Sequence, residues 1–135
     1  MTVRLLTITA SDAAELAHVR QFFRNYAAWL GVDMNFQGFA EELADLPGAY
    51  GAADGRLFYA EVDGRPAGCV GVRRLSDGMC EMKRLYVEPE ARGTGVGRQL
   101  AMAAIQAAKA LGYRRVMLDT LPAMRAKLGA VVSFA

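Results

Sequence analysis

The residues of this chain that are best suited to chemistry lie in one glycine-rich loop, Arg92-Gly93-Thr94-Gly95-Val96-Gly97-Arg98. Glycines allow dihedral angles and close backbone approaches that other residues do not, so successive N–H groups of such a loop can converge on one point. The loop leads into a segment of helical periodicity, and a helix N-terminus adds partial positive charge. Arg92 and Arg98 flank the glycines. The pattern predicts a binding site for a phosphate or pyrophosphate group.

Two common phosphate-binding motifs do not fit this loop. A P-loop requires the pattern GxxxxGK[ST], and no Lys-Ser or Lys-Thr follows these glycines. A dinucleotide site of the Rossmann type follows the first strand of its fold, with an acidic residue about 20 positions later. Here the loop comes in the middle of the chain, and Asp119 comes late. The alternative of a purely structural glycine-rich turn would not require the two flanking arginines.

Three strands are predicted before the loop. The segments Arg56–Val62, Pro66–Leu75 and Met79–Val87 have strand composition, and Asp63-Gly64 and Asp77-Gly78 between them are two-residue hairpin signals. Strands joined by such tight turns are antiparallel neighbours. The third strand therefore lies inside a sheet and delivers the chain to the loop.

A strand and two helices are predicted before these hairpins. Val3–Ile8 is a short apolar, β-branched run. Asp12 and Glu15 have the spacing of a capping box, at the start of an apolar helical pattern that Gly31 is placed to end. Phe36–Leu46 has the pattern of a second, shorter helix.

An Ala-rich helix and a further strand are predicted after the loop. Apolar residues recur at helical intervals from Val96 to Leu111, Gly112 follows, and Arg115–Asp119 has strand composition. A strand, crossover helix and strand of this length form a right-handed unit. Because the sequence shows no repeat, low-complexity tract or linker, residues 1–135 are expected to form a single α/β (α+β) domain.

Composition excludes several classes of protein. The chain has 135 residues, 53% of them hydrophobic and 22% charged, which suits one globular domain rather than a disordered or collagen-like chain. No apolar run approaches the roughly 20 residues that span a bilayer, and the first residues lack the features of a signal peptide. We therefore expect a cytoplasmic protein with no membrane partner.

Charge and cysteine content indicate neither a nucleic-acid partner nor a metal. The net charge of +2 is too weak to argue for a polyanion, although several basic residues fall in one stretch. Cys69 and Cys80 have no CxxC or Cys/His pattern, so we expect small buried side chains rather than a disulfide or metal site. The basic residues in question are Arg73, Arg74, Lys83, Arg84, Arg92 and Arg98.

The segment from Cys80 to Leu100 resembles motif A of the GNAT superfamily of N-acetyltransferases. The pattern Arg/Gln-x-x-Gly-x-Gly/Ala is met by Arg92, Gly95 and Gly97, after a strand that ends in Arg84-Leu85-Tyr86-Val87-Glu88-Pro89. The order of the predicted elements also matches that family. The resemblance implies a mixed, mostly antiparallel sheet flanked by helices, with a shortened closing helix and strand.

The resemblance implies acetyl-CoA as the cosubstrate, with no metal. In similar proteins the backbone N–H groups of the loop hold the pyrophosphate, and the end of the motif strand pairs by main-chain hydrogen bonds with the pantetheine arm, as an added strand would. A backbone N–H near Tyr86 would polarise the thioester carbonyl. The implied cofactor-binding residues are Leu85, Tyr86, Val87, Arg92, Gly93, Thr94, Gly95, Val96, Gly97 and Arg98.

The reaction that the resemblance implies is direct attack of a primary amine of a small molecule or peptide on acetyl-CoA, in a ternary complex. The ammonium must first lose a proton, and Glu81 is the candidate base because family members often carry an acid there. The alternative for Glu81 is a solvated or salt-bridged carboxylate. Asp33, Glu41 and Glu42 lie where the family forms its substrate wall and would attract a cationic amine, unless they are merely solvated.

The segment after Thr120 departs from the family pattern. The family places there a helix with a tyrosine, often the acid that protonates the CoA thiolate, followed by two strands. Here no tyrosine follows Tyr113, and Val131–Phe134 suffices for one short strand. The thiolate would then leave unassisted, or the chain is a weak or degenerate acetyl-CoA-binding module. A short closing segment also leaves a sheet edge unpaired, which favours a homodimer through that edge.

Overall fold

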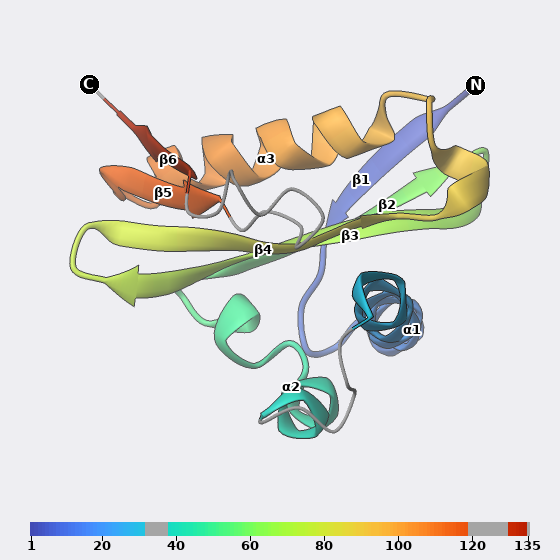
Figure 1. Cartoon of the computed structure of the whole chain (residues 1–135), viewed down its shortest axis with the longest axis horizontal. Coiled ribbons are helices and arrows are strands. Elements are labelled where there is room, and N and C mark those ends of the chain that lie inside the picture. Colours follow the sequence, from blue (N-terminus) through green and yellow to red (C-terminus); the bar gives the residue numbers. More distant parts are fainter. Residues whose placement is uncertain (32–37, 119–129, 135) are drawn as a thin grey trace.

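Helices cover both faces of a twisted sheet in the computed structural model of this chain (Figure 1). The structure describes residues 1–31, 38–118 and 130–134. Across these residues the helices are α1 (Ala13–Leu30), α2 (Phe39–Asp45) and α3 (Val96–Ala110), with short 3-10 turns η1 (Gly48–Gly51) and η2 (Pro89–Ala91). The strands are β1 (Val3–Thr7), β2 (Arg56–Val62), β3 (Arg65–Ser76), β4 (Met79–Val87), β5 (Arg115–Leu118) and β6 (Ala130–Ser133).

The strands lie in the sheet in chain order, from β1 at one edge to β6 at the other. All neighbouring pairs are antiparallel except β4 and β5, which are parallel because α3 crosses over between them. The expected mixed, mostly antiparallel sheet flanked by helices is confirmed. The predicted homodimer through the closing edge stays a prediction.

Alternate strand residues divide the apolar core into two layers. On β3, Val70 and Val72 pack on the side of α3, whereas Cys69 packs on the side of α1. The same alternation holds along β2, where Leu57 and Tyr59 join the α1 layer. Figure 1 shows α3 on one face of the sheet, with α1 and α2 on the other. A period of two along each strand therefore separates the two layers.

The hairpins form as the sequence predicts. Asp63 and Gly64 have φ angles of 52° and 79°, the left-handed pair that a two-residue turn between β2 and β3 requires. The bounds of β2 and β4 are those predicted, and β3 extends one residue further at each end.

The start of α1 differs from the prediction. The Asp12 carboxylate accepts a hydrogen bond from the backbone N–H of Thr9, at 2.7 Å, and makes no bond to the first turn of α1. Asp12 therefore closes the preceding turn and is not half of a capping box. The predicted Phe36–Leu46 helix is present as the shorter α2, and its predicted first residues, 36 and 37, lie outside the described residues.

Two further observations concern the limits of the fold. No helix among the described residues is long and apolar enough to cross a membrane. The predicted strand near the end of the chain is present as β6. The predicted closing helix before it falls at 119–129, outside the described residues.

Both cysteines of the chain are fully buried, as expected from the sequence. Burial raises the pKa of the Cys69 thiol far above its ordinary value and that of Cys80 to about 11. Because the thiolate is the reactive form, neither side chain should react with a disulfide reagent such as DTNB in the native protein at pH 8. Titration should count no thiols in the native state and two after denaturation. Rapid labelling of a native thiol would contradict this packing.

Candidate functional site

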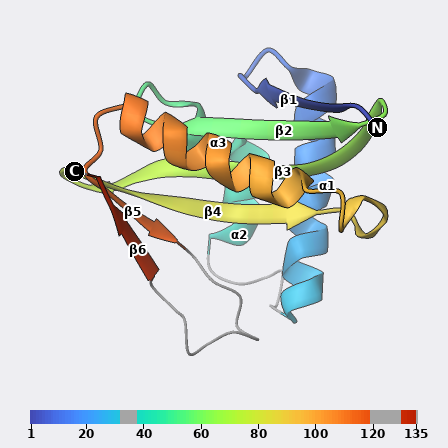
Figure 2. The same cartoon turned by 90° about the horizontal axis from the view of Figure 1, so that it is seen from above.

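Only the first half of β4 is paired with β5. Met79–Met82 pair with Arg115–Leu118, whereas Lys83–Val87 have no strand partner on that side among the described residues. Figure 2 shows β5 and β6 diverging from β4 beyond this short pairing. The second half of β4 therefore presents main-chain donors and acceptors at an open edge inside the sheet, which an extended ligand can pair with.

A bulge lies in this open half of β4. Lys83 is opposite Gly71 and Tyr86 is opposite Cys69, so β4 carries one more residue than β3 over this interval. Arg84 takes up the extra residue with a left-handed φ of 61°, which is uncommon for a side chain other than glycine. The bulge lets the consecutive side chains of Lys83 and Arg84 both face the α2 side of the sheet.

The side chain of Arg84 is held by α2. Its Nε and one terminal nitrogen donate to the two carboxylate oxygens of Glu42 at 2.9 and 3.0 Å. The rings of Phe23, Tyr26 and Phe39 lie 5.7–6.0 Å from its guanidinium carbon, within cation–π range. Burial alone would lower the pKa of Arg84, but the hydrogen bonds and charge of Glu42 raise it above its ordinary value. The guanidinium therefore stays charged in this apolar surrounding.

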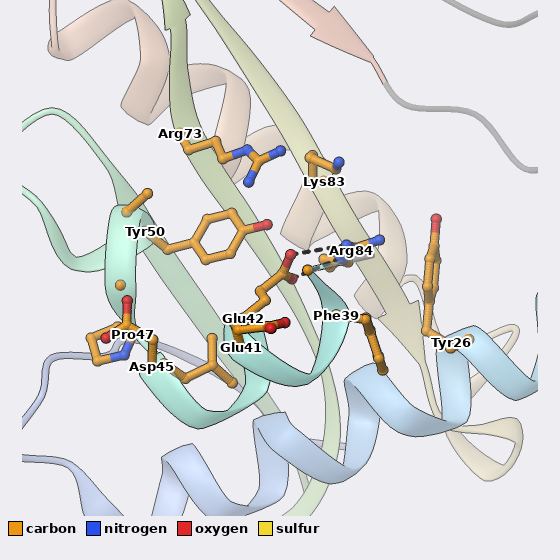
Figure 3. A pocket seen from close by; sticks show the side chains of 15 residues that line it. Tyr26, Phe39, Glu41, Glu42, Asp45, Pro47, Tyr50, Arg73, Lys83 and Arg84 are labelled. Atoms are coloured by element: carbon orange, nitrogen blue, oxygen red, sulfur yellow. Dashed lines mark hydrogen bonds and ion pairs between the residues drawn. The ribbon is translucent and has the colours of Figure 1, made fainter. Parts of the chain in front are cut away.

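A cavity of about 790 Å³ opens between α2, η1 and the adjoining strands β3 and β4 (Figure 3). Its walls are partly aromatic and carry charges of both signs. Glu41 and Glu42, which the family resemblance implies for a substrate wall, both line it, whereas Asp33 lies outside the described residues. The other principal lining side chains are Tyr26, Phe39, Asp45, Tyr50, Arg73 and Lys83.

Tyr50, from η1, is 2% exposed and lines this cavity. Its ring packs on β3 at Gly71, where a Cβ would lie 2.6 Å from ring atoms, so a larger residue at that position would displace the ring. No described residue forms a hydrogen bond with its buried hydroxyl. The pKa of Tyr50 is raised, mainly by burial and next by the charge of Glu42, while Arg84 and Arg73 oppose the rise. The hydroxyl therefore stays protonated at neutral pH.

Glu81 lies beside this cavity but does not line it. Arg73 is its cross-strand partner on β3, and the Arg73 Nε donates to a Glu81 carboxylate oxygen at 2.7 Å. Only 14% of the Glu81 side chain is exposed. The carboxylate predicted as a base is thus joined by an ion pair to an arginine of the cavity wall.

The glycine-rich loop has the geometry of an anion site. Gly95 has a φ of 88° and immediately precedes α3. No described residue accepts a hydrogen bond from the backbone N–H of Gly93, Gly95, Gly97 or Arg98. These donors stand at the positive end of a helix, which is the arrangement that binds phosphate groups.

The two arginines that flank the loop differ. The Arg92 Nε donates to the Val87 carbonyl at 3.1 Å, and its guanidinium carbon lies 5.3 Å from the centroid of Trp29, a half-exposed ring on α1. Arg98 is exposed in the first turn of α3. Arg92 therefore ties the loop to the end of β4, whereas the Arg98 side chain projects into solvent.

The structure brings the predicted cofactor residues into one continuous region. A Cβ at Gly97 would lie 3.2 Å from the Val87 side chain, so the loop begins where the open edge of β4 ends. Leu85 and Val87 pack toward α3, while Tyr86 turns toward α1, where its hydroxyl donates to Glu88 at 3.0 Å. The side chains of these three residues are thus used for packing, and their main chain remains for a ligand.

Sequence reasoning did not single out Arg84, Arg73 or Tyr50 as parts of a site. The left-handed Arg84 follows from a register shift between two strands, which has no local signal. Tyr50 lies in a loop-like stretch between Pro47 and Gly55, where a buried aromatic side chain was not expected. The long separation in sequence between α2 and β4 hides their ion pair as well.

Comparisons with known proteins agree on one family. Residues 17–129 match the acetyltransferase (GNAT) family. An uncharacterized N-acetyltransferase of Schizosaccharomyces pombe is 38% identical over 82% of this chain and 72% of its own length. A GNAT-family acetyltransferase from Staphylococcus aureus superposes with a TM-score of 0.75 at 16% identity, over 93% of this chain and 77% of the other. The PaiA N-acetyltransferase of Thermoplasma acidophilum, in complex with coenzyme A, gives 0.68 at 18% identity, over 89% and 80%.

The Glu42–Arg84 pair yields a stability prediction. Glu42→Gln keeps the shape of the side chain but removes the charge and one acceptor, leaving a largely buried guanidinium under-satisfied. We expect the free energy of unfolding, measured by urea denaturation, to fall by about 2 kcal/mol. Asp77→Asn is the matched control, because its ion pair with Arg74 is exposed to solvent and should contribute little. Equal effects of the two substitutions would show that the buried pair does not anchor β4.

Proposed function

This chain belongs to the acetyltransferase (GNAT) family, and we propose that it transfers the acetyl group of acetyl-CoA to the primary amine of a small molecule or peptide. The observation that carries the proposal is the open edge of β4, which runs from the acceptor-sized cavity to the unpartnered N–H groups of the loop. An extended thioester with a pyrophosphate at one end matches the order of these features, from the cavity along the strand edge to the loop.

The proposed cosubstrate binds along this edge. The pyrophosphate takes the N–H groups at the start of α3, and the pantetheine arm pairs with the main chain of Leu85–Val87. The PaiA protein, which shares the fold, is a complex with coenzyme A, and this supports the assignment. Arg92 already binds the Val87 carbonyl, so we propose that Arg92 positions the loop and that Arg98 adds charge at the phosphates.

The proposed reaction needs no covalent enzyme intermediate. Glu81 accepts a proton from the acceptor ammonium, directly or through water, and the neutral amine attacks the thioester carbonyl. A C–N bond forms, the nitrogen loses its second proton to solvent, the C–S bond breaks, and the CoA thiolate leaves and takes a proton from solvent. A backbone N–H near Tyr86 stabilises the charge that develops on the carbonyl oxygen.

The ion pair with Arg73 bears on Glu81 as a base. The Arg73 guanidinium donates to a Glu81 carboxylate oxygen at 2.7 Å, so that one oxygen of the proposed base is already engaged before an acceptor binds. This feature favours the second candidate function, a catalytically weak or degenerate acetyl-CoA-binding module. Binding without turnover distinguishes the module from the enzyme.

Turnover of acetyl-CoA with a panel of primary amines, followed by release of free CoA, tests the proposed function. We expect Glu81→Gln to lower kcat by about 10²–10⁴-fold, because an amide side chain cannot accept the proton of the ammonium. Glu61→Gln is the matched control, because Glu61 is also a strand carboxylate beside an arginine, Arg4, but lies outside the site. Stabilisation by acetyl-CoA with no turnover of any amine would favour the binding module.

The loop is tested separately from the chemistry. Gly95→Val forces a β-branched residue into a left-handed conformation at the centre of the proposed pyrophosphate site, and we expect CoA binding by calorimetry to be lost. Gly112→Val imposes similar strain at a φ of 91° near the opposite end of α3 and should leave CoA affinity unchanged. Retained affinity in the Gly95 variant would contradict the loop assignment.

A further inference from the structure

The wall of the cavity contains a polar group that the fold itself does not use. The Tyr50 hydroxyl is buried and forms no hydrogen bond with any described residue. Leaving such a group unsatisfied is unfavourable, because its hydrogen bonds to water are lost and not replaced. The raised pKa of Tyr50 keeps the proton on the oxygen, so the hydroxyl remains a hydrogen-bond donor.

Arg73 adds further donors next to this hydroxyl. Its Nε is engaged by Glu81, but its two terminal nitrogens donate to no other residue in the described parts of the chain. Its guanidinium carbon lies 5.9 Å from the centroid of the Tyr50 ring, and about a third of the side chain is exposed. Figure 3 shows the Arg73 guanidinium, the Tyr50 hydroxyl and the Lys83 ammonium turned toward the same part of the cavity.

We propose that Tyr50 and Arg73, beside Lys83, form a subsite for an anionic oxygen group of the acceptor, and that the acceptor is therefore an amine that also carries a carboxylate. The two terminal nitrogens of a planar guanidinium and an adjacent hydroxyl match the two oxygens of a carboxylate.

The opposite wall suits the other end of such a zwitterion. The acidic residues that line the cavity, Glu41, Glu42 and Asp45, all come from α2. Because Glu42 is occupied by Arg84, Glu41 and Asp45 are left to attract an ammonium group. The charges of the cavity are thus divided between a basic wall on the strands and an acidic wall on α2.

This inference rests on the proposed function for the fate of the amine, and the experiment separates the two. Steady-state kinetics compares acceptors that differ only in the anionic group: γ-aminobutyrate with its amide, and phosphoethanolamine with ethanolamine. We expect kcat/KM for the carboxylate to exceed that for the amide by about 10-fold or more, through KM, because hydrogen bonds to charged groups are the stronger ones. A preference only for the phosphate over its alcohol would overturn the carboxylate assignment.

Tyr50→Phe is the sharpest variant, because it removes only the unused hydroxyl. We expect it to reduce the preference for the carboxylate about 10-fold, while the Tm stays the same or rises, since an unsatisfied buried group is lost. A hydroxyl that served the fold would instead lower the Tm. Tyr59→Phe is the control, because Tyr59 is equally buried, bonds Glu61 at 3.3 Å outside the cavity, and should leave the preference unchanged.

Arg73 supplies the second arm. Arg73→Gln should abolish the preference for the carboxylate, and Arg73→Lys should restore part of it by retaining the charge. Equal kcat/KM for γ-aminobutyrate and its amide in the unmodified protein would overturn the subsite, although acetyl transfer itself would still be shown. If no amine is acetylated, the proposed function fails. The subsite is then tested by calorimetry, which compares the affinity of the protein for γ-aminobutyrate with its affinity for the amide. Binding of γ-aminobutyrate that is weakened by Tyr50→Phe supports the subsite, and equal binding of the two compounds overturns it.

Discussion

The structure depends on one arginine that occupies a backbone conformation unsuited to its type. Arg84 adopts a left-handed φ within β4, which is an unfavourable backbone conformation. Its guanidinium offsets this cost, because it donates hydrogen bonds to both carboxylate oxygens of Glu42 and contacts three aromatic rings. The resulting bulge turns Lys83 and Arg84 to one side of the sheet and lies in the half of β4 that has no β5 partner. A side-chain interaction with α2 thereby fixes the path of the strand on which the proposed site is built.

Under the proposed function, β4 serves two ligands, because its edge and its face are separate surfaces. The main chain of Leu85–Val87 has no strand partner at this edge among the described residues, and side-chain identity matters little there. The face toward α2 carries the charged side chains of the cavity. Two ion pairs hold three of those charges, Arg73 with Glu81 and Arg84 with Glu42. Pairing of this kind makes partial burial of the charges tolerable and fixes the positions of the side chains.

Features of the fold and the site were predictable from the sequence where they depend on neighbouring residues, and not where they depend on residues far apart in the chain. Local signals placed the hairpins at Asp63-Gly64 and Asp77-Gly78, the bounds of β2 and β4, and the loop at Gly95, because turn and glycine conformations are set by neighbouring residues. The bulge at Arg84 and the orphan hydroxyl of Tyr50 were not predictable, since each arises from the meeting of elements distant in sequence. Asp12 shows that a local signal can also mislead. Its carboxylate could accept a hydrogen bond from the first turn of α1 or from the preceding turn, and in the structure it accepts one from the Thr9 N–H.

The half-open β4 has a consequence for the protein in the cell. If acetyl-CoA completes the interior edge of the sheet, as proposed, the sheet lacks one strand whenever that metabolite is scarce. Unpaired strand edges are where protein chains associate wrongly. A ligand that binds only the native state adds stability in proportion to the logarithm of its concentration once it exceeds its dissociation constant. Under the proposed function, metabolic supply would thus help to set the lifetime of the folded chain as well as its rate of turnover.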